Sequence, residues 1–142
     1  MRRAVLPRRT RGLTLVEIAV VLAVAGTVAA MAWPSHLAHL QRARRLDATS
    51  ALTRLQFVQE RYRAAQGHYA ANLAELGPAA LVRSAEGLYD LSARPAGDGA
   101  VLLLARARAD RAQANDADCR EITLQLSQGL ADPGPHGRCW NQ

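Results

Sequence analysis

One apolar run constrains this chain more than any other feature of its sequence. Residues 13–33 read LTLVEIAVVLAVAGTVAAMAW, and Glu17 is the only charged residue among them. In an α-helix, which rises 1.5 Å per residue, about 20 apolar residues span the roughly 30 Å hydrocarbon core of a bilayer. The sequence therefore predicts a membrane-spanning helix over residues 13–33.

Arginine supplies all 18 basic side chains of the 142-residue chain. Five of these arginines precede the apolar run: Arg2, Arg3, Arg8, Arg9 and Arg11. This bias favours a cytoplasmic N-terminus and export of the part that follows the run. The formal charge of +6 points to an acidic partner. Without those five arginines, however, 13 basic residues face 12 acidic ones, so most of the excess is a topology signal.

Glu17 needs an explanation, because an unpaired carboxylate in a membrane span costs several kcal/mol. Cleavage after Gly12 would place a new α-amino group at Leu13, about 6 Å along the helix from Glu17. A neighbouring helix of the same kind, staggered along its axis, could bring its amine to this carboxylate, as in a filament. Two other interpretations stay open: an uncleaved anchor, and a secretory signal cut after Ala32 that releases a soluble binding protein.

The residues around the expected cut carry a resemblance. Residues 11–17, RGLTLVE, look like the prepilin-peptidase site of type IV pilins and pseudopilins, with leucine at the usual phenylalanine position. The resemblance implies cleavage between Gly12 and Leu13, N-methylation of Leu13, and an assembly role for Glu17. Gly26 and Pro34 fall at the helix-breaking positions typical of type IVa pilins. Residues 33–70 resemble the first helix of minor pilins in that class.

Helical periodicity resumes after the proline. An apolar stripe with spacings of three and four predicts the buried face of a helix: Ala48, Ala51, Leu55, Val58, Tyr62 and Ala65. The opposite, polar side is expected to carry Arg54, Gln59, Arg61 and Arg63. Gly67 is a natural end for the helix.

The C-terminal half shows strand patterns. Alternation of apolar and polar residues predicts strands over 88–94, 101–108 and 120–127, and a short last strand over 138–140. The remainder has loop composition, with one helical turn expected around 73–76. We therefore expect an α+β pilin fold: a long N-terminal helix, its first half in the membrane, packed on a three- or four-stranded antiparallel sheet.

Two cysteines, Cys119 and Cys139, lie in the part that we expect to be exported, where disulfides form. We expect a disulfide between them that closes a C-terminal loop. The alternative is two buried thiols that do not meet. In the pilins that this chain resembles, such a disulfide encloses the variable C-terminal region.

No arrangement of residues indicates catalysis, so we expect no enzyme activity, no cofactor and no metal. His36 and His39 are expected to be polar residues at the membrane surface. The acidic residues of the C-terminal half are expected to form a solvated loop: Asp110, Asp116, Asp118 and Glu121. Nucleic acid is an unlikely partner on these grounds. The acids dilute the charge of nearby Arg106, Arg108 and Arg111, and no aromatic side chains are interleaved with these arginines.

These observations predict a leader at 1–12, a transmembrane assembly helix at 13–33 and an exported head at 34–142. The resemblance implies a structural subunit, a minor one, of a type IV pilus, with cell adhesion, twitching motility and DNA uptake all open as roles of the fibre. Its partners would be other pilins, prepilin peptidase, the inner-membrane assembly platform and the lipid bilayer. It would start as a single-pass inner-membrane protein and end in an extracellular fibre. The alternatives are a type II secretion pseudopilin, a DNA-uptake pilin and the secreted binding protein.

Overall fold

The computed structural model describes residues 14–77 and 82–140, and for residues 32–35 it describes the backbone alone. The chain divides into two units, Met1–Leu37 and Ala38–Gln142. The second unit, the head, contains the strands and a hydrophobic core of its own.

Helix α1 (Leu15–Gln66) contributes residues to both units. Its first turn is capped by Thr14, whose Oγ1 accepts the backbone N–H of Glu17 at 3.2 Å. Such a cap satisfies one of the N–H groups that have no partner at a helix start. The N-terminal part of α1 is long and apolar enough to cross a membrane, and its most apolar stretch is wholly exposed in the structure.

Helix α1 continues through Gly26 and Pro34, so neither of these predicted helix-breaking residues ends the helix. Glycine costs a helix interior about 1 kcal/mol relative to alanine, and proline about 3 kcal/mol. A break in the helix would leave backbone N–H and C=O groups without hydrogen bonds, and in lipid each such group costs several kcal/mol. A continuous helix is therefore the less costly arrangement in this segment.

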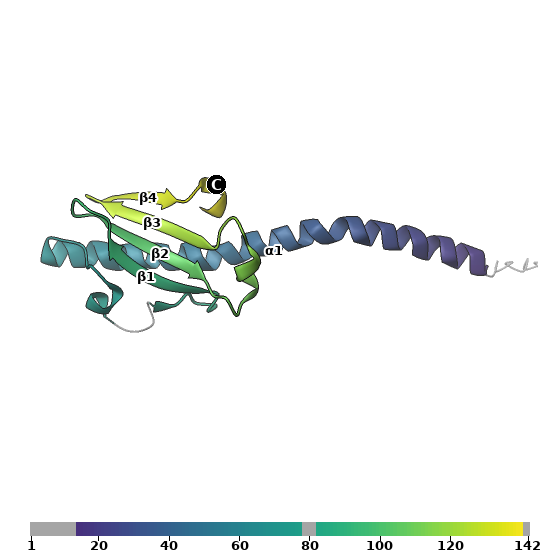
Figure 1. Cartoon of the computed structure of the whole chain (residues 1–142), viewed down its shortest axis with the longest axis horizontal. Coiled ribbons are helices and arrows are strands. Elements are labelled where there is room, and N and C mark those ends of the chain that lie inside the picture. Colours follow the sequence, from purple (N-terminus) through teal and green to yellow (C-terminus); the bar gives the residue numbers. More distant parts are fainter. Residues whose placement is uncertain (1–13, 78–81, 141–142) are drawn as a thin grey trace, which may run out of the picture. The chain divides into compact units, whose positions relative to one another are not determined.

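The head contains one antiparallel sheet with the strand order β1-β2-β3-β4. The strands are β1 (Tyr89–Pro95), β2 (Val101–Ala107), β3 (Glu121–Ser127) and β4 (Leu130–Gly134). Within the head, α1 lies across one face of this sheet (Figure 1). The predicted α+β fold, with a long helix on a four-stranded antiparallel sheet, is confirmed.

The core lies between α1 and the inner face of the sheet. Helix α1 contributes Ala48, Leu52 and Leu55, which are fully buried. The strands contribute alternate residues, since successive side chains of a strand point to opposite faces: Tyr89, Leu91, Val101, Leu103, Ala105, Ile122, Leu124 and Leu126. The short helix η1 (Leu73–Leu76) forms where one helical turn was predicted, and its Leu73 is buried against the same core.

The fourth strand was predicted in the wrong place. Residues 138–140 belong to a short 3₁₀ helix, η4 (Gly137–Trp140), and β4 forms within a segment that has loop composition. Strand β4 pairs with β3 alone, opposite Leu124 at Pro133. Proline is tolerated there because an edge strand has one side without ladder hydrogen bonds.

The buried face of α1 also differs from the predicted stripe. Leu52 is in the core, whereas Tyr62 is half-buried and Ala65 is exposed. Gln59, expected on the polar side, is completely buried. Its side-chain amide donates to the carbonyl of Ala70 at 3.1 Å and accepts the N–H of Ala70 at 2.9 Å, which satisfies this polar group inside the head.

Candidate functional site

Glu17 is the third residue of α1 and is exposed. Its backbone N–H is held by Thr14, but its carboxylate has no hydrogen-bond or ion-pair partner among the residues that the structure describes. A carboxylate in the first turn of a helix is favoured by the helix dipole. The side chain is thus placed near the helix start and is left available to a group outside this unit.

The predicted processing residues, Gly12 and Leu13, lie outside the described residues. His36 and His39, predicted at a membrane surface, are exposed on α1.

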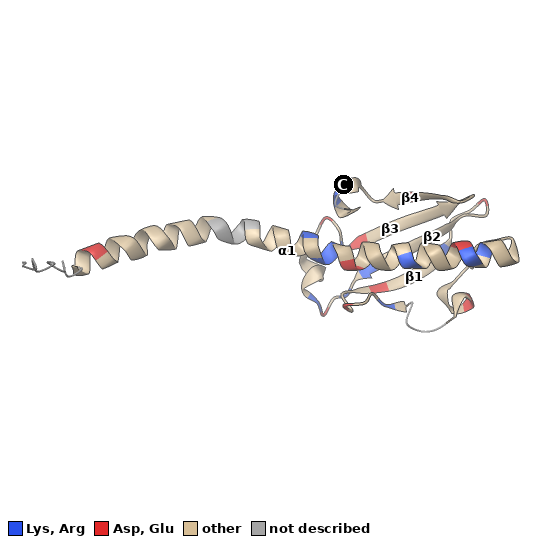
Figure 2. Ribbon diagram, turned by 180° about the vertical axis from the view of Figure 1, so that it is seen from behind, with Lys and Arg blue, Asp and Glu red and all other residues tan. Residues whose placement is uncertain are grey.

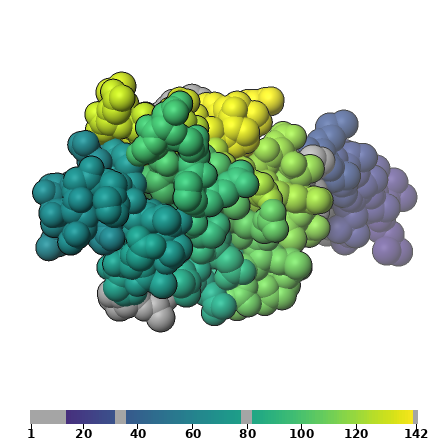
Figure 3. Space-filling view, turned by 60° about the vertical axis from the view of Figure 1, so that its left-hand side comes forward, coloured from purple at the N-terminus to yellow at the C-terminus, as the bar shows by residue number. Residues whose placement is uncertain are grey.

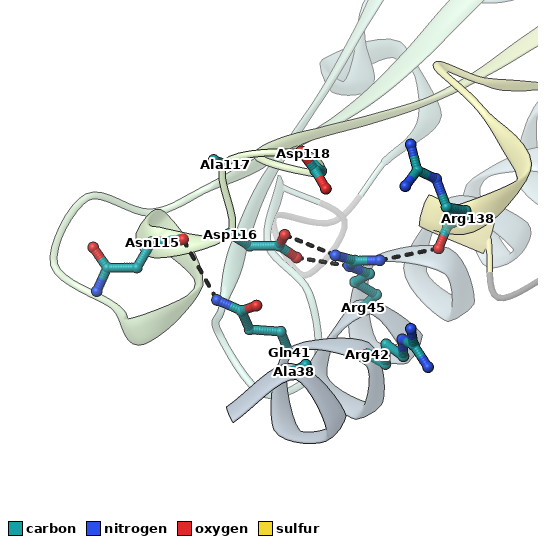
Figure 4. A pocket seen from close by; sticks show the side chains of 9 residues that line it. All are labelled: Ala38, Gln41, Arg42, Arg45, Asn115, Asp116, Ala117, Asp118 and Arg138. Carbon is teal, nitrogen blue, oxygen red and sulfur yellow. Dashed lines mark hydrogen bonds and ion pairs between the residues drawn. The ribbon is translucent and has the colours of Figure 1, made fainter. Parts of the chain in front are cut away.

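A buried ion pair joins α1 to the loop before β3. Arg45 donates from Nε to Asp116 Oδ2 at 2.7 Å and from Nη2 to Oδ1 at 2.8 Å. Its remaining nitrogen, Nη1, donates to the carbonyl of Arg138 at 3.0 Å (Figure 4). The hydrogen bonds that Arg45 donates to Asp116 raise the pKa of Arg45 above its usual value, and partial burial of the guanidinium opposes this increase. Arg45 therefore connects three segments: α1, this loop and the C-terminal turn.

Two glutamines complete this network. Gln113, in the short helix η3 (Ala112–Asn115), donates to Asp116 Oδ2 at 2.7 Å and to the carbonyl of Gln41 at 3.3 Å. Gln41 in turn donates to the carbonyl of Asn115 at 3.4 Å. Asp116 was expected in a solvated acidic loop, but it is 2% exposed because these donors replace water around its carboxylate.

A polar cavity of about 640 Å³ opens beside the network (Figure 4). Its lining includes Arg42, Arg45, Asp116, Asp118 and Arg138. Arg45 and Asp116 neutralise each other. The other charged residues that line the cavity are Arg42, Asp118 and Arg138. Figure 4 shows the carbonyl of Arg138 directed at Arg45 and the Arg138 guanidinium directed away from it.

The expected disulfide between Cys119 and Cys139 is present, with Cα atoms 5.5 Å apart. Figure 3 shows the yellow C-terminal residues against the green residues that precede β3. His136 lies beside Cys139, with Nδ1 3.4 Å from Sγ. The bonded sulfurs cannot act as thiolate ligands, so this group does not form a metal site. The disulfide holds the C-terminal turn against the start of β3.

The three arginines beside the acidic residues, Arg106, Arg108 and Arg111, all pair with acids. Arg106 donates to Glu121 at 2.7 Å, and Arg108 donates to both carboxylate oxygens of Asp110 at 3.0 Å. Arg111 lies 3.7 Å from the same carboxylate. The bonds from Arg108 hold the pKa of Asp110 below its usual value. These arginines are therefore largely neutralised.

Other arginines of the head form no ion pair with an acidic side chain among the described residues. Within the described part of the chain, six have no ion-pair partner: Arg44, Arg54, Arg61, Arg94, Arg120 and Arg138. Basic residues recur along the head half of α1 on the side that faces the viewer in Figure 2, away from the sheet. Arg120 and Arg138 are exposed and directly adjoin the two bonded cysteines.

Comparison with protein families decides the class of the chain. Residues 34–123 match the family described as type IV minor pilin ComP, DNA uptake sequence receptor. This match covers more than half of the chain. The chain belongs to this family of type IV minor pilins. Residues 7–33 match the prokaryotic N-terminal methylation motif. No curated protein matches the chain.

The minor-pilin family confirms the expectation of a non-enzymatic subunit of a type IV pilus, which assembles with other pilins. It favours the pilus over the pseudopilin and the secreted binding protein. It also contradicts the expectation that nucleic acid is an unlikely partner, because the family is described as a receptor for DNA uptake sequences. That expectation relied on the acids beside Arg106, Arg108 and Arg111 and on the lack of aromatic side chains there. Those arginines are indeed paired, but other arginines of the head are not, and duplex DNA is bound mainly through its phosphates, which need no aromatic partner.

Proposed function

We propose that this chain is a DNA-uptake minor pilin. The match of residues 34–123 to the ComP family carries this proposal. The main alternative, a pilus subunit without a role in DNA uptake, accounts for the helix and the methylation motif but not for that match. We take the organisation to be a leader at 1–12, an assembly helix at 13–33 and a head at 34–142.

The N-terminal steps follow from the methylation motif. The chain would enter the inner membrane with its arginine-rich leader in the cytoplasm. Prepilin peptidase would cut after Gly12, and Leu13 would receive the methyl group. The assembly platform would then move the subunit from the bilayer into the fibre, where Glu17 pairs with the terminus of a neighbouring pilin. The exposed Glu17 carboxylate and the exposed apolar surface of α1 support this sequence of events.

We place the DNA contact at the disulfide end of the head, defined by Arg120 and Arg138. The bonded cysteines have Cα atoms 5.5 Å apart, so the Cα atoms of the two arginines are at most about 13 Å apart. Measured along the axis of the duplex, that length corresponds to about four phosphates of one strand. Neither arginine is neutralised by an acid among the described residues, and a guanidinium binds phosphate with two parallel hydrogen bonds.

The free arginines of α1 are less suitable for DNA. Arg54 and Arg61 are exposed on α1, and α1 is the helix through which pilins assemble. A fibre would cover the exposed side of that helix with neighbouring subunits, whereas Arg120 directly precedes β3 and Arg138 lies in the C-terminal turn, so neither belongs to α1. Arg120 lies within the family match, and Arg138 lies beyond it.

Titration of labelled DNA duplexes with the full chain in detergent, followed by fluorescence anisotropy, tests DNA binding. Wild type should bind, and Arg120→Ala with Arg138→Ala should weaken binding. The slope of log K against log salt should fall by about 0.9 for each phosphate that the variant no longer neutralises. Arg106→Ala is the matched control, because Arg106 is exposed but paired with Glu121. A wild-type chain that binds no DNA, whether of mixed sequence or from the host genome, would overturn the proposal.

The processing proposal has a separate test. The mass of the mature N-terminus, measured on the purified subunit, should correspond to N-methyl-Leu13. Trp33 as the first residue would instead indicate a signal peptide and a secreted protein. Recovery of the wild-type subunit in sheared fibres should accompany the methylated terminus.

A further inference from the structure

Basic residues follow the membrane-spanning run directly. Residues 34–46 contain three arginines and no acidic residue. Arginines on the exported side of a membrane span oppose the charge bias that sets its orientation, so their presence needs a reason. Arg45 is explained by its buried ion pair with Asp116. Arg42 and Arg44 are not, because the first is exposed, the second is half-buried, and neither belongs to the hydrophobic core.

The disulfide end of the head lies beside these residues. The polar cavity of about 640 Å³ has Ala38 and Arg42 of α1 in one wall and Ala117 and Arg138 in the other (Figure 4). Arg45 holds the two walls together through its bond to the carbonyl of Arg138. The disulfide end is therefore the end of the head at which its part of α1 begins.

The length of the chain limits how far this end can lie from a bilayer. Ala38 is the fifth residue after Trp33, where the apolar run ends. Five residues span at most about 18 Å when fully extended, whatever the orientation of the head. The polar headgroups extend about 5–7 Å beyond the hydrocarbon core on each side. In the membrane-stored subunit, a wall of the cavity is thus within about 13 Å of the headgroups.

The charges at this end suit a layer of phosphates. Arg44, Arg120 and Arg138 form no ion pair among the described residues. Arg42 adds a fourth cation, and Asp118 is the acid that lines the cavity outside the buried pair, so four cations face one acid. A guanidinium binds a phosphate with two parallel hydrogen bonds, whichever molecule carries the phosphate. The arginines that we assign to DNA therefore have the chemistry to bind an anionic lipid.

We propose that headgroups of anionic phospholipids bind the disulfide end, together with Arg42 and Arg44, while the subunit is stored in the inner membrane. The lipid phosphates then occupy Arg120 and Arg138. Transfer into the fibre removes the subunit from the bilayer and frees these arginines for DNA, since attraction to a charged surface falls off within about 8 Å at physiological ionic strength. This control of DNA binding rests on the proposed function, whereas the lipid contact itself does not require DNA.

The bilayer is a better source of phosphate for this site than the solution. Free phosphate offers the same hydrogen-bonding chemistry, but the chain itself holds the headgroups next to the disulfide end. Lipid phosphates are also arranged in a layer, so several arginines can be bound at the same time. The site is therefore a membrane-docking surface of the stored subunit.

A photoreactive benzoylphenylalanine at Ala117 tests the contact. Ala117 is exposed and lines the cavity, but it lies outside α1, so it reaches lipid only when this end docks. The full chain is placed in nanodiscs of equimolar phosphatidylglycerol and phosphatidylcholine and irradiated, and mass spectrometry identifies the adducts. Phosphatidylglycerol should exceed phosphatidylcholine several-fold. The excess should shrink at about 1 M salt, where the screening length is about 3 Å, and should persist in inorganic phosphate at unchanged ionic strength.

Two double variants of the probe-bearing chain test which arginines hold the lipid. Arg42→Gln with Arg44→Gln should bring the ratio of the two lipids in the adducts close to one. Arg120→Ala with Arg138→Ala should lower the same ratio. Both variants should retain the disulfide and the unfolding midpoint of the wild type, since none of the four side chains lies in the core. The salt dependence of the wild-type adducts tests the proposal without any arginine variant.

Arg61→Gln with Arg94→Gln is the matched control. Both arginines are exposed and have no ion-pair partner among the described residues. They lie at the other end of the head: Arg61 is near the C-terminal end of α1, and Arg94 precedes Pro95, which lines a hollow with His68. This variant should keep the lipid ratio of the wild type. The same probe at Ala96, exposed after β1, should give no lipid adduct.

Four results would overturn the lipid site: no lipid adduct at Ala117, equal adducts of the two lipids, loss of the excess in inorganic phosphate, and an excess that Arg42→Gln with Arg44→Gln leaves unchanged. An excess that persists in Arg120→Ala with Arg138→Ala would show that lipid does not occupy the DNA-binding arginines, and would overturn the control of DNA binding. A chain that contacts lipid but binds no DNA in detergent would overturn the proposed function and leave the lipid site in place.

Discussion

Arg45 on α1 and Asp116 in the loop before β3 form a bidentate ion pair across 71 residues of sequence, with both side chains buried. Because Arg45 also holds the carbonyl of Arg138, this one guanidinium ties the loop and the C-terminal turn to the helix. Both segments adjoin the disulfide end, where we place the DNA contact. The pair therefore supports the position of Arg120 and Arg138 without contacting DNA itself.

Arg45→Ala should destabilise the head by about 3–5 kcal/mol, because it leaves the Asp116 carboxylate buried without its cation. Denaturant unfolding of the full chain in detergent, followed by circular dichroism, measures this loss. Arg83→Ala is the control: Arg83 and Asp90 form an exposed pair, and such pairs are worth at most about 1 kcal/mol. Equal unfolding free energies for the two variants would contradict a structural role for the buried pair.

The sequence predicts the elements whose patterns are local. The apolar run, the alternation in β1, β2 and β3, and the turn of helix at η1 all depend on neighbouring residues, and each is found close to its predicted place. Asp116 and Gln59 were misplaced because their partners, Arg45 and Ala70, come from other segments. A buried polar residue looks like a solvated one until its partner is known.

The edge of the sheet was harder to predict for a related reason. Strand β4 contains Asp132, Pro133 and Gly134, which favour turns, and it forms because β3 supplies a complete ladder on one side. The amino-acid composition of residues 130–134 does not show that β3 is available as a pairing partner. The arginines without an acidic partner can likewise be identified only from the structure, which shows that others, such as Arg106 and Arg108, form ion pairs.

Gln59→Leu should cost about 2–5 kcal/mol, because it leaves the buried N–H and C=O of Ala70 without partners. Gln56→Leu, at a half-buried position one turn earlier on α1, provides the control and should change stability much less. The unfolding free energies of the two variants, measured under the same conditions, give the comparison. Similar values for both would show that the hydrogen bonds to Ala70 contribute little.

Replacement of both cysteines, Cys119→Ala with Cys139→Ala, should lower the unfolding free energy by about 3 kcal/mol, the chain-entropy value for a loop of this length. Reductant should lower the unfolding midpoint of the wild type in the same direction. It should have no effect on the double variant, which serves as the control. A wild-type midpoint that is the same with and without reductant would mean that the disulfide does not stabilise the head.

The head should lose stability in alkaline solution. Burial raises the pKa of Tyr89, and burial together with the hydrogen bond to Glu60 raises that of Tyr69. The unfolded chain releases these phenolic protons near pH 10, whereas the folded chain retains them. Their contribution is therefore complete below about pH 10 and declines as the pH rises further. Titration of tyrosine absorbance should show ionisation at higher pH in the folded chain than in urea, and coincident curves would contradict this.

Glu17→Ala should leave the subunit in the membrane but deplete it from sheared fibres, because the carboxylate is proposed to pair with the terminus of a neighbouring pilin. Immunoblots of membranes and fibres measure the two populations. Thr14→Ala separates this role from helix capping, since it removes the hydroxyl that holds the Glu17 N–H, at a cost of about 1 kcal/mol, and keeps the carboxylate. If Thr14→Ala depletes the fibres as strongly as Glu17→Ala, the start of the helix matters and not the charge. Wild-type levels of Glu17→Ala in the fibres would exclude an assembly role for this carboxylate.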